Sequence, residues 1–93
     1  MRGIVYINGQ YHPANDAAVS VFDRGFLFGD GVYEMCLIQP HGVIVDEERH
    51  LDRFERSLKE VQIAAPVSRR VVKHLCRQVA RRNRIGFGHL YYH

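Results

Sequence analysis

The glycine-rich stretch at residues 23–34 places the strongest constraint on how this chain folds. It holds three glycines, four charged residues and three aromatic residues, and it runs directly into the apolar residues 35–38. Glycine adopts positive φ and allows close approach to the backbone, so Gly25, Gly29 and Gly31 predict an irregular turn that feeds a strand. The spacing matches neither the dinucleotide-binding pattern nor the P-loop pattern. A plain connecting loop and a loop shaped around a ligand both stay open.

Short strand patterns occur on both sides of this stretch. Asn8-Gly9 lies between β-branched and aromatic residues, which predicts a tight hairpin near the N-terminus. Residues 32–38 are the strongest strand candidate, and a turn at Pro40-His41-Gly42 leads to a returning antiparallel partner at residues 43–45. Residues 89–93 also have strand propensity. With the two helices described next, we predict an α+β domain in which a small antiparallel sheet has two helices packed on it.

The first predicted helix begins after Asp46, which is placed to cap it. Glu47 and Glu48 follow in the first turn, where the helix dipole favours acidic side chains. An apolar stripe repeats at helical spacing and consists of Leu51, Phe54, Leu58 and Val61. This stripe predicts which face of the helix is buried against the sheet.

Arg53 lies on one flank of the apolar stripe, together with His50 and Ser57. An arginine at such a rim lays its stem on apolar surface and presents its planar fork outward. Two roles stay open for it. It binds an anionic ligand, or it forms an ion pair with Glu55, Glu60 or an acid of the strand.

The second predicted helix begins after Pro66, with Ser68 as its cap, and extends to about Asn83. The residues predicted to face inward are Val71, Val72, Leu75, Cys76, Val79 and Ala80. The residues on the opposite, basic side are Arg70, Lys73, Arg77, Arg81 and Arg84. We interpret this side as a solvated face or a docking surface. The alternative is a small basic binding module for nucleic acid or an acidic partner.

The charge is unevenly distributed along the chain. Residues 1–60 carry ten acidic and six basic side chains, whereas residues 61–93 carry seven basic and no acidic ones, so the two parts attract each other. No segment approaches the roughly 20 apolar residues that cross a bilayer. Cys36 and Cys76 lack metal-binding spacing, and we interpret both as buried apolar side chains. We therefore expect a cytoplasmic protein with no metal site, no membrane contact and no nucleic-acid partner.

Two motifs and the order of the elements resemble a known family. The motifs are Asp23-Arg24-Gly25-x-x-Phe28-Gly29-Asp30-Gly31-Val32-Tyr33-Glu34 and His50-Leu51-x-Arg53. Residues 1–93 resemble the N-terminal domain of class IV (fold-type IV) pyridoxal-phosphate aminotransferases, and the Val-Tyr-Glu sequence is most like the D-amino acid aminotransferase branch. The resemblance implies a homodimer that uses pyridoxal 5'-phosphate to transfer an amino group from a D-amino acid such as alanine to a 2-oxo acid. The alternatives within the family are a branched-chain L-amino acid aminotransferase and an aminodeoxychorismate lyase.

The resemblance also implies roles for three residues. Arg53 matches the arginine that binds the cofactor phosphate, Tyr33 matches a tyrosine beside the substrate carboxylate, and Tyr91 matches a second pocket tyrosine. Such enzymes hold the cofactor as a Schiff base on a lysine, but Lys59 and Lys73 are the only lysines here and both are predicted on solvated helix faces. We therefore expect this chain to lack a catalytic residue and to be inactive alone. The final strand ends without a turn, which predicts that this chain is the first part of something longer. The resemblance implies that the lysine belongs to a larger C-terminal domain.

Overall fold

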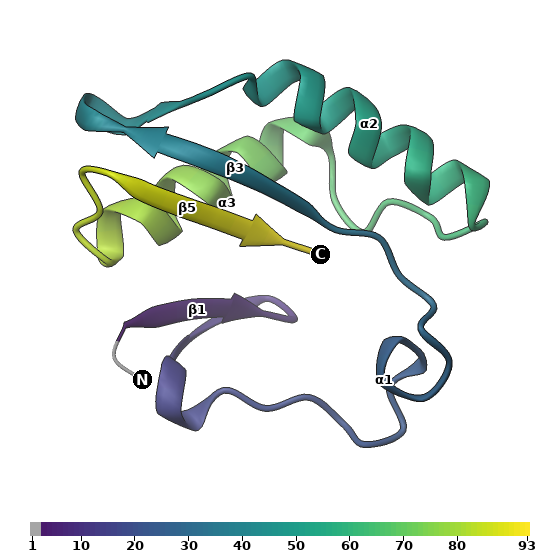
Figure 1. The fold of residues 1–93 in the computed structure, drawn as a ribbon. Helices are drawn as coiled ribbons and strands as arrows, with labels where there is room; N and C mark the ends of the chain where they lie inside the picture. The colour runs from purple at the N-terminus through teal and green to yellow at the C-terminus, as the bar shows by residue number, and fades with distance from the viewer. Residues whose placement is uncertain (1–2) are drawn as a thin grey trace.

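The computed structural model describes residues 3–93, which form two small antiparallel sheets, two long helices and a short helix (Figure 1). In chain order the elements are β1 (Ile4–Ile7), β2 (Gln10–Pro13), η1 (Ala14–Asp16), α1 (Arg24–Phe28), β3 (Glu34–Gln39), η2 (Pro40–Gly42), β4 (Val43–Ile44), α2 (Glu47–Glu60), α3 (Arg69–Arg82) and β5 (Gly88–Tyr92). Strand β1 pairs with β2, and β3 lies between β4 and β5. The predicted α+β arrangement is confirmed. Within residues 3–93, every helix is too short or too polar to cross a membrane.

The N-terminal hairpin forms as predicted and is attached to α3. Asn8 and Gly9 have φ angles of 49° and 92°, the positive values that a tight hairpin turn requires. The amide nitrogen of Ile4 donates to Asn83 Oδ1 at 2.7 Å, and Asn83 Nδ2 donates to the Ile4 carbonyl oxygen at 2.8 Å. Asn83 therefore binds both polar backbone groups of one residue in β1.

The three-stranded sheet buries one face against the long helices, which lie along the same side of β3 and β5 in Figure 1. Strand β3 alternates, with Glu34, Cys36 and Ile38 buried and the intervening Met35 exposed. The core cluster consists of Cys36, Ile38, Cys76, Ala80 and Leu90. The predicted burial of both cysteines is confirmed, and burial raises the pKa of the Cys76 thiol to about 12.

The helices begin and end close to the predicted residues, but the details at their ends differ. Ser68 accepts a hydrogen bond from the Val71 amide at 3.3 Å, as expected of a cap. Asp46 occupies the capping position with a φ of 54°, and its side chain makes no capping hydrogen bond, so that prediction is wrong. Val61 and Val71 are exposed, since Val61 lies just beyond α2 and Val71 lies in the first turn of α3.

The glycine-rich stretch forms the short helix α1, where a turn was predicted. Asp23 caps this helix by accepting from the Gly25 amide at 2.9 Å, and Gly29 ends it with a φ of 69°. Gly25 is therefore helical, and β3 begins at Glu34, two residues later than predicted. Apolar side chains around α1 are exposed, namely Val19, Val21, Phe22, Phe26, Leu27 and Phe28.

Candidate functional site

Arg53 of α2 forms a two-pronged ion pair with Glu34 at the start of β3. Arg53 Nε donates to Glu34 Oε2 at 2.9 Å, and Nη2 donates to Oε1 at 2.8 Å. The Glu34 side chain is 2% exposed and that of Arg53 is 57% exposed. Hydrogen bonds from Arg53 lower the pKa of Glu34 from its ordinary value, against the opposing effect of burial. Glu34 is therefore an ionised carboxylate beneath a partly exposed guanidinium.

His50 is the second partner of this carboxylate. Its Nδ1 lies 2.6 Å from Glu34 Oε1, and the hydrogen bond lowers the pKa of Glu34 further. An ionised carboxylate only accepts hydrogen bonds, so His50 Nδ1 carries the hydrogen. His50 precedes Arg53 by three residues on the same face of α2, which brings both donors to one carboxylate.

Arg53 keeps donors that Glu34 does not occupy. A guanidinium has five N–H donors, and the pair with Glu34 occupies the Nε hydrogen and one hydrogen on Nη2. Among residues 3–93, the structure gives Arg53 no other hydrogen-bonding partner. One Nη1 hydrogen and the second Nη2 hydrogen thus form a free outer edge that suits a phosphate or carboxylate. The ion pair with a strand acid is present, and it leaves Arg53 able to bind an anion.

Tyr33 and Tyr91 lie together, with ring centroids 5.7 Å apart in a stacked arrangement. Both are more than half exposed. Tyr91 pairs with Met35 across the sheet, while Tyr33 immediately precedes β3. The structure therefore brings the two predicted pocket tyrosines side by side on the open face of the sheet.

Arg53 and the tyrosine pair both lie at the beginning of β3. Glu34 is buried and accepts from Arg53 and His50 of α2, whereas the Tyr33 ring is exposed and stacks on Tyr91. Residues 33 and 34 are consecutive, and the two groups meet at the beginning of β3. The predicted site residues thus form two subsites that border one strand end.

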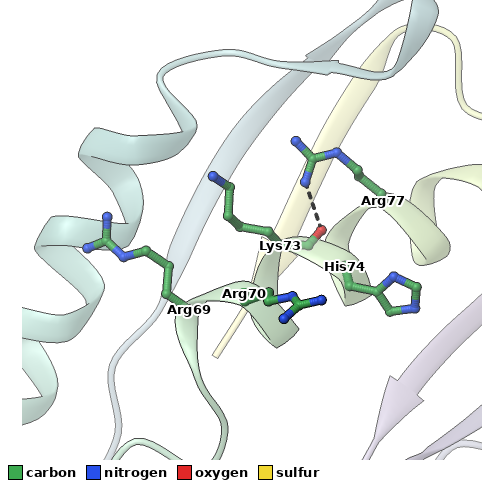
Figure 2. A pocket seen from close by; sticks show the side chains of 5 residues that line it. All are labelled: Arg69, Arg70, Lys73, His74 and Arg77. Carbon is green, nitrogen blue, oxygen red and sulfur yellow. Dashed lines mark hydrogen bonds between the residues drawn. The ribbon is translucent and has the colours of Figure 1, made fainter.

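The basic side of α3 is divided between two directions (Figure 2). Arg69, Lys73 and Arg77 extend toward α2, whereas Arg70 and His74 point the other way; together these five side chains line an open hollow. The three that face α2 pair with its acidic side chains, namely Glu47, Glu48, Asp52 and Glu55. The two helices therefore neutralise much of each other's charge, which confirms the predicted attraction between the acidic and basic parts of the chain.

The two lysines lie outside the Arg53 cluster. Lys59 is exposed on α2, and Lys73 of α3 donates to Glu48. In the described part of the chain, no group of three or more histidine, cysteine or acidic side chains is placed to hold a metal ion. The candidate site is therefore built from an arginine, its two neighbours and two tyrosines.

Glu34 and His50 are the residues that the sequence interpretation did not assign to the site. In the sequence interpretation, an unnamed acid of the strand is one candidate partner of Arg53, which includes Glu34, and His50 lies on the same flank of the helix as Arg53. A signal for Glu34 was present, since it has the same alternation as Cys36 and Ile38 and therefore falls on the buried face. A buried carboxylate requires a cationic or hydrogen-bonding partner, and α2 supplies two.

Comparisons with known sequences match most of the chain. The sequence profile described as "Amino-transferase class IV" matches residues 31–92. The aminodeoxychorismate lyase of Bacillus subtilis (strain 168) is 35% identical over 85 residues, which are 91% of this chain and 29% of that protein. The D-alanine aminotransferase of Listeria innocua is 33% identical over 87 residues, 94% of this chain and 30% of that protein. The chain thus spans less than a third of the length of these relatives.

Solved structures share the fold. The branched-chain aminotransferase of Thermoproteus uzoniensis, with norvaline, superposes with a TM-score of 0.81 at 22% identity, covering 96% of this chain and 31% of that one. A second branched-chain amino acid aminotransferase, complexed with N-(5'-phosphopyridoxyl)-L-glutamate, superposes with a TM-score of 0.87 at 22% identity. The superposition covers 98% of this chain and 32% of that one. The match over residues 31–92 includes β3, α2, α3 and β5. The chain belongs to the class IV aminotransferase family.

Proposed function

We propose that this chain is the small N-terminal domain of a longer pyridoxal-phosphate-dependent transaminase. The observation that carries the proposal is that the Arg53 side chain stays 57% exposed while Glu34 occupies only its Nε and one Nη2 hydrogen. A planar guanidinium edge fits a phosphate through two parallel charge-assisted hydrogen bonds. The family of the chain supports this assignment.

The residues of this chain bind and orient in the proposed enzyme. Bound pyridoxal 5'-phosphate supplies an electron sink for negative charge that develops at the substrate α-carbon. Arg53 holds its phosphate. The Tyr33 hydroxyl donates to the substrate carboxylate, and Tyr91 stacks on Tyr33 and limits the positions of its ring. The lysine that moves protons belongs to the C-terminal domain that we propose follows residue 93.

We propose a D-amino acid such as alanine as the amino donor and a 2-oxo acid as the acceptor. Tyr33 in the Val-Tyr-Glu sequence supports this choice, as do the relatives named D-alanine aminotransferase. The relative named aminodeoxychorismate lyase favours a second candidate, the release of pyruvate from aminodeoxychorismate. Assaying the complete enzyme with D-alanine plus a 2-oxo acid, and separately for pyruvate release from aminodeoxychorismate, distinguishes the two. Activity in the second assay alone would exclude the transaminase proposal.

We also propose that the complete enzyme is a cytoplasmic homodimer. The apolar side chains exposed around α1 support an interface in a larger assembly. The unpaired, buried Cys36 and Cys76 fit a reducing compartment. Light scattering on the complete enzyme should give twice the mass of one chain, and the mass of a single chain would contradict the proposal.

Arg53→Ala in the complete enzyme tests the phosphate assignment. Affinity for pyridoxal 5'-phosphate should fall about 10- to 100-fold, the range expected for losing charge-assisted hydrogen bonds. Affinity for pyridoxal, which lacks the phosphate, should stay unchanged. Titrations of the folded apoenzyme with both compounds measure the difference. An equal loss for both compounds would show that Arg53 does not hold the phosphate.

Tyr33→Phe tests the carboxylate assignment. The variant keeps the ring that stacks on Tyr91 and loses only the hydroxyl. The KM for the amino acid should rise about tenfold, as expected for one hydrogen bond to a charged group, while cofactor affinity stays the same. Steady-state kinetics in the complete enzyme measure both constants. An unchanged KM would remove Tyr33 from the carboxylate site.

A further inference from the structure

The orientation of Arg53 depends on Glu34. An arginine side chain that is 57% exposed on a helix samples many rotamers unless a partner holds it. Glu34 holds it in one arrangement, because Nε and Nη2 contact different carboxylate oxygens and so fix the plane of the guanidinium. The side that faces outward is therefore always the edge that carries Nη1.

Glu34 is itself firmly held. Its side chain is buried, its backbone pairs with Tyr92 of β5, and His50 Nδ1 donates to its Oε1. Oxygen Oε1 accepts from both His50 and Arg53, while Oε2 accepts from Arg53 alone. Both oxygens of the carboxylate thus accept hydrogen bonds. Because the carboxylate is fixed relative to the sheet, the guanidinium bound to it is fixed as well.

We propose that Glu34 is a positioning residue for Arg53, holding its inner edge so that the Nη1 edge is presented to the cofactor phosphate. The inference rests on the proposed phosphate role of Arg53 and assigns a role to a second residue. An arginine that is already held in place binds a phosphate more tightly than a mobile arginine. The held side chain loses its rotamer freedom when the protein folds, so binding does not have to restrict it further.

Glu34 also has an opposing effect. Its negative charge lowers the positive potential around Arg53, which by itself disfavours an anion. The outer edge of Arg53 is exposed to water, which screens this repulsion, whereas the fixed orientation is a short-range effect that water does not weaken. We therefore expect positioning to dominate, and the sign of the change in affinity decides between the two effects.

Two substitutions separate position from charge in the complete enzyme. Glu34→Gln removes the charge and one acceptor, whereas Glu34→Asp keeps the charge and withdraws the carboxylate by one methylene. Each should weaken pyridoxal 5'-phosphate binding about tenfold. This is the loss in affinity expected when a charged hydrogen bond to the phosphate becomes poorly placed. Binding of pyridoxal should not change. In the Arg53→Ala background, neither substitution should weaken phosphate-dependent binding further.

A measurement on the complete enzyme without its cofactor reports positioning independently of cofactor binding and activity. The Arg53 Nε–H donates to a buried carboxylate, so its ¹⁵N-detected NMR signal should exchange slowly with water. Glu34→Gln should abolish this signal. Glu55→Gln is the matched control, since Glu55 accepts from Arg69 Nε at 2.9 Å, and it should remove the Arg69 signal while leaving that of Arg53.

The outcomes distinguish the two proposals. If Arg53→Ala leaves phosphate-dependent binding unchanged, the phosphate role of Arg53 fails and this inference falls with it. If Arg53→Ala weakens it while Glu34→Asp has no effect and Glu34→Gln strengthens it, Arg53 holds the phosphate but Glu34 only reduces its charge. Persistence of the slow Arg53 signal in Glu34→Gln would likewise overturn the positioning role.

Discussion

Arg53 and Arg69 are both paired with glutamates, yet their surroundings differ. Arg53 contacts one buried carboxylate and is 57% exposed. Arg69 is 30% exposed and contacts three carboxylates, with Nε and Nη2 on Glu55, Nη2 also on Asp52 and Nη1 on Glu48. One arginine keeps an unoccupied edge, while the other uses both edges within the protein.

The comparison shows that an ion pair alone does not identify a structural arginine. Arg69 joins α3 to α2 and has carboxylates at each of its three nitrogens. Arg53 joins α2 to β3 through one edge only. The number and direction of the unoccupied donors indicate which arginine is available for a ligand.

The largest expected effect is the loss of stability when Glu34, the partner of Arg53, is replaced, compared with the loss when Glu55, a partner of Arg69, is replaced. Glu34→Ala should lower the free energy of unfolding by about 2 kcal/mol, because the hydrogen bonds to a buried carboxylate are lost. Glu55→Ala should cost clearly less, since Glu55 is 44% exposed and water replaces its partner. Urea denaturation of both variants measures the difference. Equal losses would contradict the distinction between the two clusters.

Acid and salt together provide the second test. The pKa of Glu34 is lowered by Arg53, and that of Glu55 is lowered by Arg69. Each therefore contributes stability above the ordinary pKa of glutamate, and the contribution is lost as pH falls through the lower folded value. At 1 M salt the Debye length is about 3 Å, so the exposed Arg69 cluster should lose most of its acid dependence while the buried Glu34 keeps it.

The same acid titration at 1 M salt should flatten in Glu34→Gln and remain unchanged in Glu55→Gln. The measurement is the unfolding free energy between about pH 3 and pH 6, a range of roughly 1.5 units on each side of the ordinary glutamate pKa. If salt removes the acid dependence of both clusters, Glu34 is more accessible to water than its burial indicates.

The smallest expected effect comes from His50→Ala. The variant removes one of the hydrogen bonds to Glu34 and should cost about 1 kcal/mol of unfolding free energy. The two-pronged contact with Arg53 does not require His50, so the slowly exchanging Arg53 signal should persist. Thermal unfolding and the NMR spectrum measure the two results. Loss of the signal would make His50 part of the arrangement that positions Arg53.

Most of the regular elements could be predicted from sequence because local patterns encode them. Asn8-Gly9 specifies the hairpin, Ser68 begins α3, and the apolar spacing of Leu51, Phe54 and Leu58 specifies the buried face of α2. These signals act over a few residues, and each was confirmed. The rim position of Arg53 follows from the same periodicity.

The remaining features depend on tertiary structure. The partner of Arg53 could not be chosen among several acids, because Glu34 is 19 residues away and only the packing of α2 on β3 brings them together. Asp23 caps a helix of five residues, too short for its periodicity to stand out from a turn.

The two hydrogen bonds between Ile4 and Asn83 also bear on how the chain folds. The hairpin of β1 and β2 needs only local residues, but its anchor lies 79 positions later, at the end of α3. Docking of the hairpin therefore closes a loop that spans most of the described residues, and contacts of such long sequence separation slow folding. A variant without the Asn83 side chain amide would leave the two polar backbone groups of Ile4 without this partner, so we expect it to loosen the hairpin from α3.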